Sequence, residues 1–250
     1  MNGKPELNHT MPFLQRGLFL TSIVVVVSAQ AAVITEPARV FTVGYTLEDF
    51  QDPPALFVQT ISDSSILQLT EVRVGLNLVG ATGGGGFASE IFVSLTKDLG
   101  ASAVLLNRVG VTSTDAVGFG YDGWDVVFRD GAAAGDIHGS ALSVGVLQGE
   151  WEPDGRLDAT TEARLGMLQV FVGQAGNGEW SLNVADLDYG GIMRLESWSL
   201  TLTGLTAVSP VPEATGWGGI GMGILFVAWK LWASRRRMGM GLGADRMTGL

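Results

Sequence analysis

Alternation of apolar and polar side chains with a period of two is the feature that most constrains this fold. It recurs from residue 38 to residue 206 and is clearest between Ile66 and Leu78. Successive side chains of a β-strand point to opposite faces, so this period indicates strands that bury one face. The pattern slips by one position near Thr70, which predicts a β-bulge there.

Further segments with the same alternation follow at short intervals, separated by turns rich in Gly, Asp and Asn. No segment of this region keeps a 3.6-residue apolar stripe for three turns, so helices are not expected in it. The sequence predicts an all-β fold, a β-sandwich or jelly roll of eight or more strands. The other predicted strands are 91–96, 103–106, 124–128, 142–147, 180–184 and 198–202.

A first apolar run, residues 17–28, lies between Arg16 and the tripeptide Ala29-Gln30-Ala31. A basic start, an apolar stretch of this length and two small residues are typical of an N-terminal signal peptide. We expect signal peptidase to cut after Ala31, with Ala29 and Ala31 at the cleavage site. An uncleaved anchor is the alternative, and either Met1 or Met11 is the start.

A second apolar run spans about residues 216–234 and ends just before three arginines, Arg235, Arg236 and Arg237. At 1.5 Å per residue, a helix of this length just crosses a hydrocarbon core of about 30 Å. The arginines favour a cytoplasmic location for that end, so the body is expected outside the membrane. This predicts a C-terminal transmembrane helix, with a buried core helix as the alternative.

The order Val211-Pro212-Glu213-Ala214, apolar helix, Arg235-Arg236-Arg237 resembles a PEP-CTERM sorting signal. That family combines a short Pro-Glu-Pro motif, a transmembrane helix and a basic cluster. The resemblance implies an exosortase-like membrane transpeptidase as partner, which cuts near the motif and passes the protein to the surface. Ala214 stands in place of the last proline, and thirteen residues follow the arginines.

Two stretches, residues 66–109 and 178–202, resemble the P/Homo B domain of proprotein convertases. The second contains the paired motifs Gly178-Glu179-Trp180-Ser181-Leu182 and Ser197-Trp198-Ser199-Leu200. The resemblance implies a P-domain-like jelly roll with a galactose-binding-like fold. In that family the domain is an accessory to a subtilisin-like catalytic domain, and no such catalytic sequence is found in these 250 residues. A catalytic role is therefore not implied.

Charge is unevenly distributed along the chain. The stretch from Val33 to Pro210 holds 22 acidic and 8 basic residues and so carries a charge of −14, whereas both ends are basic. An acidic body repels phosphates, so no nucleic-acid partner is expected. The chain has no cysteine, which excludes disulfides, thiolate zinc sites and cysteine nucleophiles.

His138 is the one histidine that follows the predicted signal peptide, and it lies in a Gly-rich segment. A Ser-His-acid triad needs such a base, but the chain has no Gly-x-Ser-x-Gly elbow. We interpret His138 as a solvent-facing loop residue and expect no enzyme activity. The glycine-rich segment 80–87 lacks the Lys-Ser/Thr of a phosphate-binding loop and is interpreted as a turn between strands.

Calcium is the one cofactor that the sequence suggests, because it takes six to eight oxygen ligands and aspartates crowd the region around Trp124. Asp186 and Asp188 also follow the predicted strand that begins at Trp180. A solvated acidic surface is the alternative. The candidate ligands are Asp122, Asp125, Asp130 and Asp136.

The tryptophans allow both a core and a ligand-binding interpretation. Trp180 and Trp198 each have Leu two residues on, so alternation predicts that both are buried. Asp154-Gly155, which follows Trp151-Glu152-Pro153, is interpreted as a simple turn, so Trp151 is predicted in a turn context. Trp151 is therefore the candidate for an exposed ring that stacks on a sugar.

Together these features predict an exported, non-enzymatic β-sandwich protein that passes through an inner-membrane-anchored intermediate to the cell envelope surface or extracellular matrix. Two alternatives remain open: a carbohydrate-binding surface lectin with extracellular polysaccharide as its partner, or an accessory P domain associated with a separate subtilisin-like serine protease. The predicted boundaries are 1–31 for the signal peptide, 32–208 for the sandwich, 209–237 for the sorting signal and 238–250 for a cytoplasmic tail.

Overall fold

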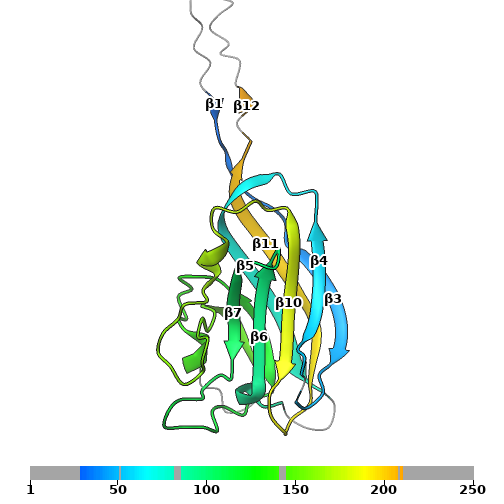
Figure 1. Ribbon diagram of the computed structural model, residues 1–250, viewed down its shortest axis with the longest axis vertical. Helices are drawn as coiled ribbons and strands as arrows, with labels where there is room; N and C mark the ends of the chain where they lie inside the picture. Colours follow the sequence, from blue (N-terminus) through cyan, green and yellow to red (C-terminus); the bar gives the residue numbers. More distant parts are fainter. Residues whose placement is uncertain (1–28, 51, 82–85, 141–144, 208, 211–250) are drawn as a thin grey trace, which may run out of the picture. The chain divides into compact units, whose positions relative to one another are not determined.

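The computed structural model describes residues 29–50, 52–81, 86–140, 145–207 and 209–210. Both predicted membrane-directed runs, the sorting motif and the arginine cluster lie outside these ranges. Within them, no helix is long and apolar enough to cross a membrane. Gln30–Ser209 form one compact unit, and its described residues are drawn in colour in Figure 1.

A four-stranded antiparallel sheet forms one layer of this unit. Its strand order is β4 (Ala55–Ile61), β10 (Gly178–Asp186), β6 (Ile91–Lys97) and β7 (Ser102–Asn107). In β10, Trp180, Leu182 and Val184 are fully buried. These side chains share one face because a strand alternates its side chains, and that face lies against the second sheet.

A six-stranded sheet forms the other layer. Its order is β2 (Val33–Thr35), β11 (Met193–Thr206), β5 (Ile66–Gly80), β8 (Gly123–Phe128) and β9 (Val146–Trp151), and β3 (Arg39–Thr46) also pairs with β11. The strands β8 and β9 are parallel, so a crossover connection must link them. That crossover contains the short 3-10 helix η2 (Ile137–Gly139), which carries His138. A separate two-stranded ladder joins β1 (Ala29–Gln30) to β12 (Ser209–Pro210).

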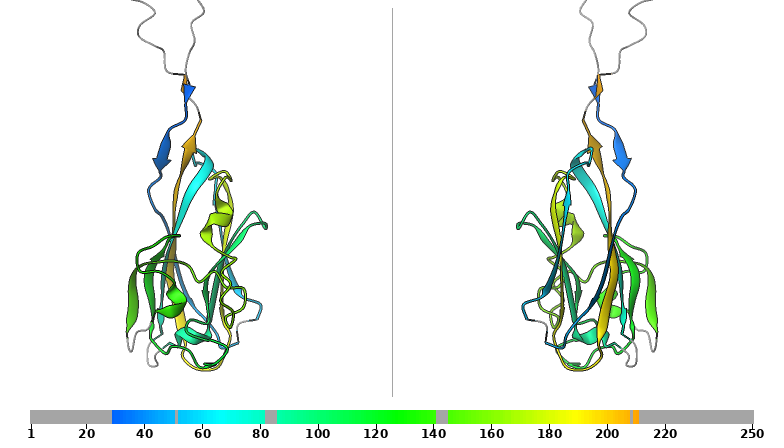
Figure 2. Two further views of the ribbon diagram at one scale, coloured as in Figure 1. Left: turned by 90° about the vertical axis from the view of Figure 1, so that its left-hand side faces the viewer. Right: turned by 90° about the vertical axis from the view of Figure 1, so that its right-hand side faces the viewer.

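The core lies between the two sheets, which Figure 2 shows from both sides. Trp124, Trp180 and Trp198 are its largest fully buried side chains. The 3-10 helix η3 (Leu168–Phe171) adds Phe171, whose ring lies 5.1 Å from that of Trp180, centroid to centroid. A third 3-10 helix, η1 (Ala88–Glu90), precedes β6. The described residues thus form an all-β, two-layered fold, and the predicted burial of Trp180 and Trp198 is confirmed.

The predicted irregularity near Thr70 is present in β5. Glu71 pairs with Thr203, whereas Leu69 pairs with Gly204, so Thr70 has no partner in the ladder. The register shifts again nearer the start of β5, where Leu205 pairs with Gln68 and Thr206 with Ile66. Leu67, which lies between these two pairs, is 60% exposed.

The predicted strand 142–147 differs from the observed one. Within the described residues, β9 begins at Val146 and continues past Leu147 to Trp151. Trp151 is consequently the last residue of a strand that pairs with β8, and its predicted position in a turn is wrong.

Candidate functional site

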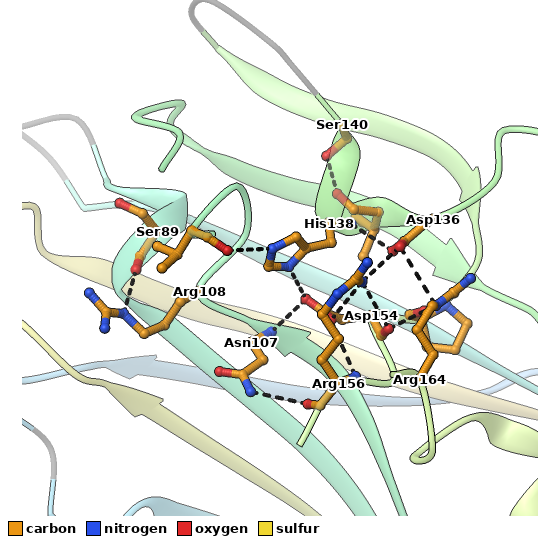
Figure 3. Close-up of polar contacts among 12 residues, drawn as sticks. Ser89, Asn107, Arg108, Asp136, His138, Ser140, Asp154, Arg156 and Arg164 are labelled. Atoms are coloured by element: carbon orange, nitrogen blue, oxygen red, sulfur yellow. Dashed lines mark hydrogen bonds and ion pairs between the residues drawn. The ribbon is translucent and has the colours of Figure 1, made fainter. Parts of the chain in front are cut away.

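The crossover after β8 and the segment after β9 meet in a buried ionic network, shown in Figure 3. We define the Asp154 network as Asp136, His138, Asp154, Arg156 and Arg164. Asp154 is fully buried, and His138 and Arg156 are each only 6% exposed. Charged side chains are rarely buried to this extent unless they are paired.

Both ring nitrogens of His138 face hydrogen-bond acceptors. Nδ1 lies 2.7 Å from Asp154 Oδ2, and Nε2 lies 2.8 Å from the main-chain carbonyl oxygen of Val111. A carbonyl oxygen only accepts and an ionised carboxylate only accepts, so both nitrogens must carry a proton. Burial lowers the pKa of His138, but the hydrogen bond and the charge of Asp154 outweigh burial and leave that pKa above its usual value.

Every oxygen of the Asp154 carboxylate has a partner. Oδ2 also accepts a hydrogen bond from the main-chain N–H of Asn107 at 3.2 Å. Oδ1 accepts from the main-chain N–H and from Nη1 of Arg156, both at 3.3 Å. Arg156 Nη1 donates in addition to Asp136 Oδ2 at 2.7 Å. The network is therefore closed within the described residues, with two cations set against two carboxylates at its centre.

Arg164 fixes the main chain of the same segment. Its Nε donates to the carbonyl oxygen of Asp154 at 2.9 Å, its Nη2 to that of Pro153 at 2.5 Å, and its Nη1 to Glu152 Oε2 at 2.7 Å. The main-chain N–H groups of Asp154 and Gly155 donate to carbonyl oxygens of β7. The segment thus covers the free edge of β7, which would otherwise present unpaired main-chain groups.

This arrangement corrects two interpretations of the sequence. His138 is buried rather than solvent-facing. Asp154-Gly155 is not a simple turn, because its main chain pairs with the edge of β7 and its neighbour Glu152 forms an ion pair with Arg164. The hydroxyl of Ser140 donates to the carbonyl oxygen of Ile137 at 2.5 Å and not to His138. An imidazolium with both N–H groups engaged has no lone pair to accept a proton, so this His–Asp pair cannot act as a general base in the form described.

The four aspartates predicted as calcium ligands have separate environments. Asp125 is exposed on β8. The other three accept hydrogen bonds from different donors: Asp122 from Gly145, Asp130 from Leu168 and Gln169, and Asp136 from His138 and Arg156. In the described part of the chain, no three His, Cys, Asp or Glu side chains form a group that could hold a metal ion. Calcium at these four residues stays a prediction.

Trp151, the predicted sugar-stacking residue, is partly buried and packs against the hydrophobic core. Its indole N–H donates to the carbonyl oxygen of Gln148 at 3.0 Å. The ring therefore serves the packing of β9, and its role toward a sugar stays a prediction.

A second group of acidic side chains surrounds Glu90 in η1 and Asp186 at the end of β10. Asp186 is fully buried and Glu90 is 9% exposed. Burial and then the charge of Asp186 raise the pKa of Glu90 to about 7. Burial likewise raises the pKa of Asp186 to about 6, and the charges of Asp49 and Asp188 add to this. Sequence analysis did not select Glu90, because no local motif distinguishes it.

Comparison with known proteins extends the P-domain resemblance. The family model of the proprotein convertase P-domain matches residues 147–202. This range runs from β9 through η3 and β10 into β11, and it includes Asp154, Arg156 and Arg164. It overlaps the stretch 178–202, so the resemblance inferred from the two tryptophan motifs is supported. No curated protein matches the chain.

Two solved structures are among those to which this chain is similar. A serine protease of Aeromonas sobria, in complex with the chaperone ORF2, is 15% identical, with a TM-score of 0.41, over 70% of this chain and 28% of that chain. The serine protease of Aeromonas sobria without the chaperone is 15% identical, with a TM-score of 0.40, over 69% of this chain and 27% of that chain. The chain thus spans little more than a quarter of the length of these proteases.

Proposed function

We propose that this chain is an exported, non-enzymatic P-domain-like module of the cell surface that binds and stabilises a separate subtilisin-like serine protease. The observation that carries the proposal is the P-domain family match over residues 147–202. In proprotein convertases, the domain of this type accompanies a catalytic domain and does not itself perform the chemistry. The proposal assigns the same accessory role to this chain, with the protease as a separate polypeptide.

The chemistry of the Asp154 network supports a binding role over a catalytic one. Its carboxylates and cations are paired with one another, and Asp154 and His138 are closed off from solvent. Such a network links Arg164 to Glu152, and the main chain of Asp154 and Gly155 pairs with the edge of β7. A preformed surface loses less conformational entropy when it binds a partner, which favours affinity.

Delivery to the surface is proposed from the sequence. The N-terminal run is proposed as a signal peptide for signal peptidase, and the C-terminal run as a sorting signal for an exosortase-like transpeptidase. Both proposals rest on the order of apolar and basic segments, which is typical of chains that meet a membrane at each end.

The lectin alternative, as placed at Trp151, has less support. Trp151 is partly buried, and Trp124, Trp180 and Trp198 are buried; the exposed aromatic rings among the described residues are those of Tyr45, Phe50, Phe87 and Tyr189. Glycan-array binding that is lost on Trp151→Ala would reverse this preference.

The accessory role is tested with the full chain and a subtilisin-like protease from the same organism that lacks a P domain of its own. We expect a complex by size-exclusion chromatography at micromolar concentration and a several-fold longer half-life of protease activity on heating. The variant Asp154→Ala should protect the protease less, because it frees residues 152–155 from the edge of β7. The exposed-site variant Glu162→Gln should protect the protease as well as the unaltered chain does. An unchanged half-life together with the absence of a complex would refute the accessory role.

A further inference from the structure

Two carboxylate oxygens in the acidic group around η1 and β10 are buried without a partner. Glu90 Oε2 and Asp186 Oδ2 are inaccessible to solvent and accept no hydrogen bond from any described residue. The two side chains belong to neighbouring strand ends, since the main-chain N–H of Leu187 donates to the carbonyl oxygen of Glu90 at 2.8 Å. Each carboxylate accepts one main-chain hydrogen bond, Glu90 from Gly191 and Asp186, through Oδ1, from Asp188 at 3.3 Å. The second oxygen of each is buried without a donor or a counter-charge, which is unfavourable.

The charges nearby do not supply that partner. Asp49 and Asp188 are close enough to act on the buried pair, and both are acidic. The guanidinium of Arg108 is turned elsewhere, because its Nη2 lies 3.7 Å from Asp188 Oδ2 and its Nε donates to the carbonyl oxygen of Ser89 at 3.1 Å. In the described residues this end of the sandwich therefore concentrates negative charge around two unsatisfied oxygens.

The loop after β10 closes over the carboxylate of Glu90. The main-chain N–H of Gly191 donates to that carboxylate. A Cβ on Gly190 would lie only 2.4 Å from Glu90 Oε1, so glycine there allows the main chain to pass directly beside it. Main-chain carbonyl groups of such a loop are common ligands of hard cations.

We propose that Glu90 and Asp186 provide the side-chain ligands of a calcium site at this end of the sandwich. Calcium prefers oxygen ligands and accepts flexible geometry, and it takes the remaining oxygens from main-chain carbonyl groups and water. Among the described residues no three His, Cys, Asp or Glu side chains form a group that could hold a metal ion, so this site needs main-chain carbonyl groups and water for its other ligands. The bound ion neutralises the buried pair and ties the loop after β10 to η1 and β6.

The test is thermal unfolding of the full chain in detergent, followed by tryptophan fluorescence, in calcium and in chelator. A ligand that binds only the folded state raises the melting temperature by mass action, and calcium at a hundredfold excess over its Kd should raise it by about 5–10 °C. Isothermal titration should give one ion per chain. Asp186→Asn and Glu90→Gln keep the side-chain shape and remove the charge, and each should lose this rise. Glu179→Gln, an exposed carboxylate on the same strand β10, should retain it.

Two results would overturn the proposal. One is an unchanged melting temperature of the unaltered chain in 10 mM calcium relative to chelator. The other is a calcium-dependent rise that persists in Asp186→Asn and Glu90→Gln but is lost in Asp122→Asn, which would locate the ion at the aspartates around Trp124. Folding of the variants is checked in chelator, where removal of one of two repelling charges should leave the melting temperature equal or higher.

Discussion

At the scale of single residues, His138 shows how a fold imposes a charge on a side chain. Its two ring nitrogens meet Asp154 and the carbonyl group of Val111. Loss of a proton would point a nitrogen lone pair at one of these acceptors, so the folded state favours the imidazolium. Asp136 and Arg156 are the other charged groups of the network that face this region, and Arg156 acts against the charge of His138.

The stability of the chain should therefore fall as the pH rises above neutrality. The pKa of His138 in the folded state is raised above its unfolded value of about 6.5. The folded state then binds the proton more tightly, so the stabilisation is complete below pH 6.5 and is lost as the pH rises through the folded pKa. Melting temperatures from pH 6 to pH 9 should decline for the unaltered chain and much less for His138→Gln. A melting temperature that rises across this range in the unaltered chain would contradict the assignment.

Removal of the Asp154 carboxylate should be one of the most damaging single changes. Asp154→Ala leaves Arg156 and His138 buried without their shared counter-charge, and breaking a buried ion pair in this way typically destabilises a protein by about 3–5 kcal/mol. Urea unfolding measures the effect. Glu162→Gln removes a carboxylate that lies 3.6 Å from the same arginine but is 95% exposed, and it should change stability by less than about 0.5 kcal/mol. A loss below 1 kcal/mol for Asp154→Ala would show that the network relaxes around the gap.

At the scale of elements, strands whose sequence alternates apolar and polar residues were predictable. In β10 and β11 the apolar residues recur at every second position, so residues 180–184 and 198–202 identified both strands. β4 carries exposed Leu56 and Val58 between its inward residues, which hides the period of two. β3 is interrupted by Gly44, whose φ of +68° departs from a regular strand.

The Asp154 network was not predictable from local pattern. Its members come from the crossover after β8 and from the segment after β9, and Asn107 of β7 donates to Asp154 across 47 residues of sequence. A period of two or a turn motif reports which face a residue occupies, but not which distant side chain it meets. Only the pairing of β8 with β9 brings His138 to Asp154. The one local signal for the network was the presence of charged residues, Asp154 and Arg156, in the segment between the core strands β9 and β10.

The start of β8 provides a test of close packing between elements. Gly123 has a φ of +128°, and a Cβ there would lie 2.2 Å from the carbonyl oxygen of Leu78 in the neighbouring strand. Gly123→Ala should destabilise the chain by more than the roughly 1–3 kcal/mol expected for backbone strain alone. Gly131→Ala is the matched control, because its φ is +74° and no atom lies within 4 Å of the added Cβ. Equal losses in chemical denaturation for the two variants would contradict the predicted clash.

At the scale of the whole molecule, composition and periodicity were sufficient to predict an all-β fold, and the tryptophan motifs pointed to the P-domain. They did not predict which sheet each strand joins, because the order of strands depends on contacts far apart in sequence. The parallel pair β8–β9 is an example, since neither strand differs in pattern from an antiparallel one.

The C-terminal segment should be removed from the mature protein. Gly218, Gly219, Gly221 and Gly223 weaken the outer half of the apolar run, since glycine adds little apolar area and lowers helix stability by about 1 kcal/mol relative to alanine. A weak helix beside Pro212-Glu213 suits presentation to a transpeptidase. Mass spectrometry of native surface material should find a C-terminus between residues 210 and 214, and replacement of Pro212 and Glu213 should block release. Peptides that reach Leu250 in the surface fraction would instead identify a permanent anchor.

The position of β11 in the larger sheet has a consequence for when this chain can fold. β11 pairs with β5 along one edge and with β2 and β3 along the other, so the first strands of the unit find their partner in the last long one. During synthesis, the six-stranded sheet cannot close before residue 206 has emerged, and pairings over such separations form slowly. We therefore expect the larger sheet of a nascent chain to stay incomplete until almost all of the body has been made. The chain is proposed to be exported across a membrane. Late formation of the larger sheet would keep it unfolded enough for transport until β11 has crossed.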